Sequence, residues 1–269
     1  MPFTFLHAAD LHLDSPLKGL AGQDDPAADA LRGATRRAFE NLVELALTED
    51  VAFLVIAGDL LDGDWLDVNT VQALMRGLAR LTTAGITVVV LRGNHDAASS
   101  VLKATPWPEG VHELSARKPE TVELAEVGVA IHGQSFPHAA VEEDLAAGYP
   151  APQPGRFNIG VLHTALEGDN VHATYAPCSP AALARQGYDY WALGHVHSHR
   201  MVHRDPPIVF PGNLQGRHVR ETGAKGAVLV TVSDQRVSDV AFRPLDVARW
   251  TELDVDVTEC TDRAAVLAA

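Results

Sequence analysis

Apolar runs of strand length alternate with helical segments over about the first hundred residues. The runs at residues 52–57 and 86–91 are apolar throughout, which is typical of strands in a sheet that is covered on both faces. Helical segments occur at residues 27–47, rich in Ala, Leu and Arg, and at residues 68–81. This alternation predicts βαβ units around a buried sheet.

From about residue 111 the pattern changes to closely spaced strands with few helix signals. We expect strands at residues 121–124, 127–132, 158–162, 190–193, 208–210, 227–232 and 237–243. A second sheet packed on the first, with helices outside, explains both halves better than two independent domains. Residues 136–157, rich in Pro, Gly and Ala, are predicted to form a surface excursion, and residues 251–257 alternate like one more strand.

Charge and cysteine content restrict the partners and the compartment. A net charge of −14 disfavours simple adhesion to nucleic acid or anionic membranes, so any attraction to DNA must be local. No apolar run approaches the ~20 residues of a membrane span, and the N-terminus lacks the pattern of a secretory signal. Cys178 and Cys260 lie far apart, without metal-ligand spacing. Free thiols and a cytoplasmic location are therefore expected, with no membrane partner.

Polar residues with metal-binding chemistry follow five of the apolar strands. In open α/β sheets, ligands bind beyond the carboxyl ends of the strands, so these turns can converge in one place. A single Asp-x-His occurs by chance in many proteins, whereas five such segments in this order are hard to explain by chance. The segments are Asp10-Leu-His12, Gly58-Asp59-Leu-Leu-Asp62, Gly93-Asn94-His95-Asp96, His163, and Gly194-His195-Val-His197.

The donor set consists of oxygen and imidazole nitrogen without thiolate, which suits manganese, iron or zinc rather than a structural zinc site. Asp10 and His12 are two residues apart, so in an extended conformation they lie on one side and can hold one ion. His195 and His197 repeat this spacing. The glycines that precede ligands allow tight turns and close backbone approach.

The order of these motifs resembles the calcineurin-like metallophosphoesterase superfamily over residues 10 to 197. Within it, residues 5–16 (FLHAADLHLDSP) and 210–223 (FPGNLQGRHVRETG) resemble the SbcD/YhaO-like DNA repair exonucleases, relatives of the Mre-type nuclease. The resemblance implies an α/β fold, a four-layer α/β/β/α sandwich of two mixed sheets, with two divalent metals at one end. Manganese is the first choice, with iron or zinc as alternatives.

The resemblance also implies roles for individual residues. Asp10, His12 and His197 would hold one metal, Asn94, His163 and His195 the other, and Asp59 would bridge both. Two such ions would activate a water and clamp the phosphate oxygens.

His95 is the candidate to contact the phosphate and protonate the leaving oxygen, and Asp62 would orient its ring. Asp96 is either a hydrogen-bond partner of His95 or a turn residue. Arg217, His218 and Arg220 form a basic cluster that either contacts substrate phosphate or lies in a solvated turn.

Members of the SbcD branch carry further C-terminal segments that cap the site and engage an SMC-like ATPase. Here a short helix signal at residues 261–262 is followed by only a few residues. We therefore expect a catalytic domain at residues 1–245 and the truncated start of a capping segment at residues 246–269. DNA is the expected substrate, and an SMC-like ATPase and a second copy of the chain are candidate partners.

Three functions remain open at this point. The first is a DNA exonuclease or endonuclease in repair. The second is a phosphodiesterase or phosphatase of small phosphate esters or nucleotides, which the acidic balance favours. The third, a non-catalytic scaffold, is disfavoured because all seven ligand positions and His95 are filled.

Overall fold

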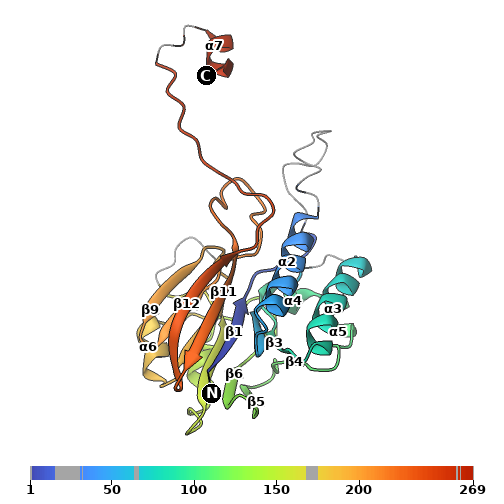
Figure 1. Cartoon of the computed structure of the whole chain (residues 1–269), viewed down its shortest axis with the longest axis vertical. Coiled ribbons are helices and arrows are strands. Elements are labelled where there is room, and N and C mark those ends of the chain that lie inside the picture. The colour runs from blue at the N-terminus through green and yellow to red at the C-terminus, as the bar shows by residue number, and fades with distance from the viewer. Residues whose placement is uncertain are drawn as a thin grey trace.

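Two six-stranded sheets lie at the centre of the computed structural model, which describes residues 2–15, 31, 33–63, 67–167, 175–258, 260 and 262–268 (Figure 1). The first sheet has the order β12-β11-β1-β2-β3-β4. Its strands β1 to β4 run parallel, and β11 and β12 complete it antiparallel. Their bounds are β1 Phe3–Ala8, β2 Phe53–Ala57, β3 Thr87–Leu91, β4 Val111–Glu113, β11 Gly226–Ser233 and β12 Arg236–Pro244.

The second sheet has the order β5-β6-β7-β8-β10-β9. Strands β6, β7, β8 and β10 are parallel neighbours, and the two edge strands pair antiparallel. Both sheets are therefore mixed, as expected. The bounds are β5 Glu120–Leu124, β6 Val129–Gly133, β7 Phe157–His163, β8 Tyr190–Gly194, β9 Arg200–Arg204 and β10 Pro207–Phe210.

Helices cover the outer faces of both sheets, which confirms the four-layer α/β/β/α arrangement (Figure 1). Helices α2 and α3 pack on the first sheet, and α6 packs on β9 and β10 of the second. The helices are α2 Ala34–Thr48, α3 Val68–Thr83, α4 Asn94–Ala98, α5 Ser100–Ala104, the 3-10 helix η1 Leu145–Gly148, α6 Pro180–Arg185 and α7 Arg263–Ala268. None within the described ranges is both long enough and apolar enough to cross a membrane.

The strand alternation divides the core into layers. On β1, Leu6 packs toward the helices, whereas Phe5 packs between the sheets. There the ring of Phe5 stacks on Phe53 with centroids 4.8 Å apart and meets Tyr190 edge-on at 5.3 Å. Successive side chains of a strand point to opposite faces, so one buried strand can serve two cores. The apolar runs seen in the sequence follow from this double burial.

The predicted surface excursion at residues 136–157 is only partly correct. The segment is irregular apart from η1, but Phe136, Val141 and Tyr149 are buried within it. The Tyr149 hydroxyl donates to the Val161 carbonyl at 2.8 Å, which ties the segment to β7. The high content of Pro, Gly and Ala indicated irregular backbone correctly, but the isolated large apolar side chains anchor that backbone to the core.

The strand expected at residues 251–257 does not form. The segment is extended and exposed, with Leu253 79% exposed, and it leads to α7 (Figure 1). An alternating pattern produces a strand only where a neighbouring strand accepts its backbone hydrogen bonds. Before it, Trp250 Nε1 donates to the Gly216 carbonyl at 3.2 Å. The expected division at residues 245 and 246 stays a prediction.

Candidate metal centre

The carboxyl ends of β1, β2 and β3 in one sheet meet those of β7 and β8 in the other. Contacts of β2 with β7 and β8 align the sheets. At their junction, His163 donates from Nδ1 to the Ala57 carbonyl at 2.9 Å, and a Cβ on Gly194 would overlap that carbonyl oxygen. The five predicted turns therefore converge, although they are separated by up to 187 positions between Asp10 and His197.

Asp10, His12 and His197 form the first group, with one ligand atom of each within 4.8 Å of the others. The Nε2 atoms of His12 and His197 are 3.3 Å apart, and His197 Nε2 lies 3.9 Å from Asp10 Oδ1. Nitrogen atoms and a carboxylate oxygen that face one another in this way form the donor set of a divalent transition metal. These three residues fit a metal site.

Asp59, His163 and His195 form the second group, also within 4.8 Å. The side-chain oxygen of Asn94 lies 3.0 Å from His163 Nε2 and adds a fourth donor. Asp59 Oδ2 lies 3.4 Å from His163 Nε2 and 3.8 Å from His12 Nε2. Asp59 is therefore placed between the two groups, where one carboxylate can reach both.

Outer hydrogen bonds turn the imidazoles toward this centre. His163 donates from Nδ1 to a carbonyl, and His197 donates from Nδ1 to Glu221 Oε1 at 2.8 Å. Both acceptors are oxygens without a proton, so each Nδ1 carries a proton and each Nε2 faces the other ligands. Such partners set the tautomer and ring orientation of metal-binding histidines.

At His12 and Asp59, electrostatics favour the protonation states that bind cations. Burial and, after it, the Arg217 guanidinium lower the pKa of His12 to about 3, so this ring is neutral. Burial alone would raise the pKa of Asp59, but His163, His12 and His95 outweigh it and lower the pKa below its usual range. A neutral imidazole and an ionised carboxylate are the forms that metals require.

Four of these residues have a positive φ angle, a backbone conformation that residues other than glycine rarely adopt. The φ angles are 53° at Asp10, 41° at His12, 54° at Asp59 and 98° at His195. Conformations of this kind cost on the order of 1–3 kcal/mol each and concentrate at functional sites. Backbone hydrogen bonds maintain two of them, from Asp10 N to the Gly58 carbonyl at 2.9 Å and from His12 N to the Asp59 carbonyl at 3.0 Å.

Comparison with known proteins agrees with this geometry. Residues 3–199 match the sequence model of the calcineurin-like phosphoesterases. The chain belongs to this family.

Two relatives extend the comparison. The uncharacterized metallophosphoesterase YhaO of Bacillus subtilis (strain 168) is 37% identical over 267 residues, which cover 98% of this chain and 65% of YhaO. The DNA double-strand break repair protein Mre11 of Methanopyrus kandleri is 28% identical over 230 residues, covering 77% of this chain and 48% of Mre11. The chain thus spans about two thirds and about half of these relatives.

Among solved structures, a dimetal phosphatase from Danio rerio superposes with a TM-score of 0.51 at 12% identity. The match covers 86% of this chain and 93% of the phosphatase. At this identity the likeness supports the fold alone. It agrees with the two mixed sheets described above.

The phosphoesterase also brings His95 and Asp62 together, as the sequence predicts. His95 Nδ1 and Asp62 Oδ1 are 2.9 Å apart, and the carboxylate raises the pKa of His95. The Ser15 hydroxyl donates to Asp62 Oδ2 at 2.6 Å. The His95 ring meets the His12 ring edge-on at 4.9 Å, so it borders the first group while its side chain stays 39% exposed.

Asp96 takes neither of the two roles that the sequence left open. It accepts backbone N–H groups from Leu60 and Leu61 at 3.0 Å and from Gly93 at 3.2 Å. It is buried and joins the loop after β2 to the loop after β3. Its contribution to the centre is to hold these two ligand-bearing loops together.

The three residues of the predicted basic cluster differ in exposure and in contacts. Arg217 Nη1 donates to the Ser15 hydroxyl at 3.2 Å and lies 3.7 Å from Asp62 Oδ2, beside the His95 pair. His218 and Arg220 are exposed and line a polar pocket, and Arg217 forms another part of its wall. Of the two alternatives, Arg217 is therefore not in a solvated turn.

Sequence reasoning missed Glu221. Its buried carboxylate accepts from His197 Nδ1 at 2.8 Å, from the Arg217 backbone N–H at 2.6 Å and from Asn213 Nδ2 at 3.0 Å. The residue lies inside the stretch 210–223 that carries the family resemblance. That position was its only signal, because an acid among basic residues does not reveal which way it points.

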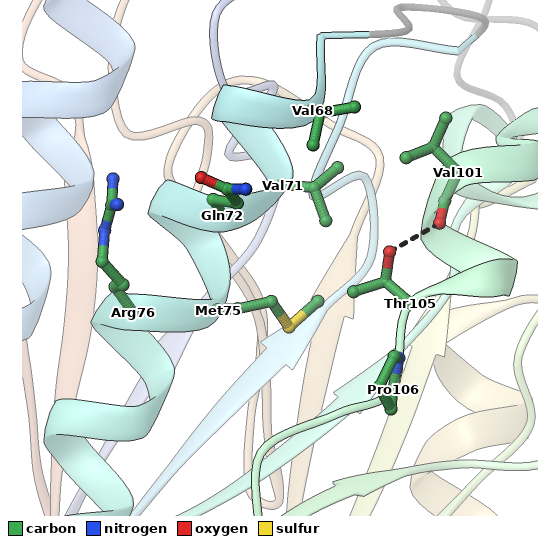
Figure 2. A pocket seen from close by; sticks show the side chains of 8 residues that line it. All are labelled: Val68, Val71, Gln72, Met75, Arg76, Val101, Thr105 and Pro106. Atoms are coloured by element: carbon green, nitrogen blue, oxygen red, sulfur yellow. Dashed lines mark hydrogen bonds between the residues drawn. The ribbon is translucent and has the colours of Figure 1, made fainter.

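A second hollow lies between α3 and α5 and contains none of the metal-site residues. Figure 2 shows Val71 and Met75 of α3 facing Val101 and Thr105, whose hydroxyl donates to the Val101 carbonyl at 2.9 Å. The described residues of its lining are mainly apolar and include no acid or histidine. It is a groove between packed helices, whereas the side chains that can bind metal lie in the loops after the strands.

Proposed function

We propose that this calcineurin-like phosphoesterase hydrolyses phosphodiester bonds with two metal ions and acts as a nuclease on DNA in repair. The observation that carries the proposal is the position of Asp59, whose Oδ2 faces His163 of one ligand group and His12 of the other. Membership of the family supports phosphoester hydrolysis. The match to a protein named for DNA double-strand break repair supports DNA as the substrate.

The proposed ligands follow the two groups. Asp10, His12 and His197 would hold one ion. Asn94, His163 and His195 would hold the second, and Asp59 would serve both. Two divalent ions in such a site lower the pKa of a water and neutralise charge on the phosphate oxygens. The resemblance to the SbcD/YhaO-like branch makes manganese the first choice, and the oxygen and imidazole donors also suit iron or zinc.

The chain's own proton chemistry is assigned to His95. The Asp62 carboxylate at 2.9 Å raises the pKa of His95 and therefore favours the protonated ring. A protonated imidazole at the edge of the centre can bind a phosphate oxygen and donate its Nε2 proton to the leaving oxygen. Ser15 and Arg217 hold Asp62 in place through contacts to Oδ2. Asp62 thus positions the proton donor.

A net charge of −14 favours a second candidate, hydrolysis of small phosphate esters or nucleotides. Such substrates need no extended basic surface. The filled ligand set argues against a scaffold that merely keeps the fold. The resemblance to the SbcD branch also suggests an SMC-like ATPase and a second copy of the chain as partners. These stay proposals, because the chain spans only part of the length of its relatives.

The deciding experiment is a nuclease assay on end-labelled linear DNA, single-stranded and duplex, with added Mn²⁺. Bis-p-nitrophenyl phosphate serves as the small ester, and Asp59→Asn controls for a contaminating enzyme. DNA degradation that disappears in Asp59→Asn supports the nuclease. Hydrolysis of the small ester alone would move the proposal to the phosphodiesterase, and no hydrolysis of either would contradict both.

A further inference from the structure

A polar pocket adjoins the metal centre at His197. His197 belongs to the first ligand group through Nε2, and the same residue lines the pocket. Arg217, which contacts the Asp62 and Ser15 side chains, forms another part of the wall. A substrate held at the metal centre could therefore extend directly into this pocket.

The pocket is locally basic in a strongly acidic chain. Arg217, Arg220 and Lys225 line it together with His218, and Glu221 is the only acid among the described residues of its wall. Glu221 is already occupied by hydrogen bonds from His197, Arg217 and Asn213. The Arg217 guanidinium, whose Nη2 lies 3.8 Å from Glu221 Oε1, offsets the charge of that carboxylate, so Arg220 and Lys225 leave the pocket with a surplus of positive charge.

The cations of the wall differ in how they are held. Lys225 is only 5% exposed and its Nζ donates to the His197 carbonyl at 2.7 Å, so it is fixed next to a ligand. Arg220 is exposed, and within the described part of the chain its guanidinium has no ion-pair or hydrogen-bond partner. An unpaired guanidinium is well suited to binding phosphate with two parallel hydrogen bonds.

We propose that this pocket binds a second phosphate of the substrate, one that is not hydrolysed, and that it thereby selects a nucleic-acid strand over an isolated ester. The inference rests on the proposed function, since the metal centre must hold the scissile phosphate for the pocket to receive its neighbour. A local basic site of this kind also answers how a chain of net charge −14 can attract DNA.

Equilibrium binding tests the pocket without turnover. The probe is a fluorescein-labelled, phosphorothioate-linked thymidine hexanucleotide with Mn²⁺, followed by fluorescence anisotropy, and its integrity is checked by electrophoresis after each titration. Arg220→Glu is compared with Arg236→Glu. Arg236 is also an exposed arginine, at the start of β12 and at the opposite end of the first sheet from the metal loops, and both variants change the net charge equally.

We expect Arg220→Glu to weaken hexanucleotide binding by about tenfold, as for loss of a charge-assisted contact. Arg236→Glu should stay within about twofold of the wild type. Arg220→Ala should reduce the slope of log Kd against log salt by about 0.7, the value for one phosphate contact to a single strand. A purely structural role of Arg220 would leave that slope unchanged.

Equal Kd values for Arg220→Glu and Arg236→Glu would overturn the inference. A second competition experiment uses thymidine 5′-diphosphate. If it competes as strongly as unlabelled hexanucleotide, and if Arg220→Glu abolishes this competition, the pocket binds nucleotides and the proposed binding of a nucleic-acid strand is overturned. Hydrolysis of bis-p-nitrophenyl phosphate by the wild type is measured separately. Its failure would count against the metal centre, whereas the Kd comparison would still decide the pocket.

Discussion

The substitution Glu221→Gln removes one negative charge behind the first ligand group and keeps the side-chain shape. Glu221 accepts three hydrogen bonds, from His197 Nδ1, the Arg217 backbone N–H and Asn213 Nδ2. Burial would raise the pKa of Glu221, but the hydrogen bond and the charge of His197 outweigh it and lower the pKa, so the carboxylate is ionised at neutral pH. Glutamine supplies one acceptor oxygen and one NH₂ group in its place.

Either orientation of the new amide leaves a donor facing a donor. If the NH₂ group faces His197 Nδ1, the ring must give up its Nδ1 proton, and the other tautomer places a proton on Nε2 where the metal binds. If it faces Arg217 N, a buried N–H loses its acceptor, which costs about 1–3 kcal/mol of stability. Loss of such an outer partner lowers metal affinity or activity by about 10- to 100-fold.

The assay is isothermal titration of Mn²⁺ into the metal-free protein, combined with thermal unfolding. The control is Glu123→Gln, because Glu123 is also a hydrogen-bonded carboxylate but lies on the surface, where it accepts from Gln153 Nε2 at 3.0 Å and Arg156 Nη2 at 3.2 Å. The control should leave Mn²⁺ affinity unchanged. Wild-type Mn²⁺ affinity in Glu221→Gln, within about twofold, would refute the argument that this carboxylate orients His197.

Three further predictions concern the centre itself. His95→Asn should retain Mn²⁺ but lower turnover by at least about 100-fold, as for loss of a proton donor, and a variant that loses both would point to a ligand role. Gly93→Ala should lose about 1–3 kcal/mol of stability and weaken Mn²⁺ binding, because the added Cβ would overlap Asp59 Oδ1 and lie 2.7 Å from His163 Cε1. Gly148→Ala, whose Cβ would meet only Pro119 Cγ at 3.5 Å, is its control in thermal unfolding, and equal melting temperatures would contradict the clash. Burial lowers the pKa of His163, but Asp59 and Asp10 outweigh it and raise the pKa to about 9 in the metal-free protein. Mn²⁺ must displace that proton, so its affinity should rise from pH 6 toward pH 9, and calorimetry in two buffers that shows no proton release would contradict this.

The ligand-bearing turns could be predicted because their signals are local. Each apolar strand runs straight into glycine, aspartate, asparagine or histidine, and the parallel neighbours β1, β2 and β3 end at one edge of their sheet. What the sequence could not supply is the contact between sheets. The close approach of Gly194 to the Ala57 carbonyl depends on packing of β8 against β2, and no periodicity within either strand encodes it.

The backbone conformations were equally out of reach. Asp and His tolerate the left-handed region better than most residues, so their presence permits φ values of 53° at Asp10 and 41° at His12 without requiring them. The expectation that Asp10 and His12 share one side of an extended segment reached the correct grouping through the wrong geometry. Both residues are left-handed, and the loop closes on Gly58 and Asp59 through backbone hydrogen bonds.

The stretch after β10 shows most directly why side-chain direction escapes sequence reasoning. Arg217 and Arg220 are three residues apart and both line the pocket, but Arg217 contacts Asp62 whereas Arg220 is exposed. The cause is Glu221, whose Oε2 accepts the Arg217 backbone N–H while its Oε1 accepts from His197. One carboxylate therefore sets the turn and orients a metal ligand at the same time. In an irregular segment, the spacing of residues does not determine where their side chains point. Only the tertiary partner of a side chain decides whether it lies beside the Asp62–His95 pair or remains exposed at the pocket.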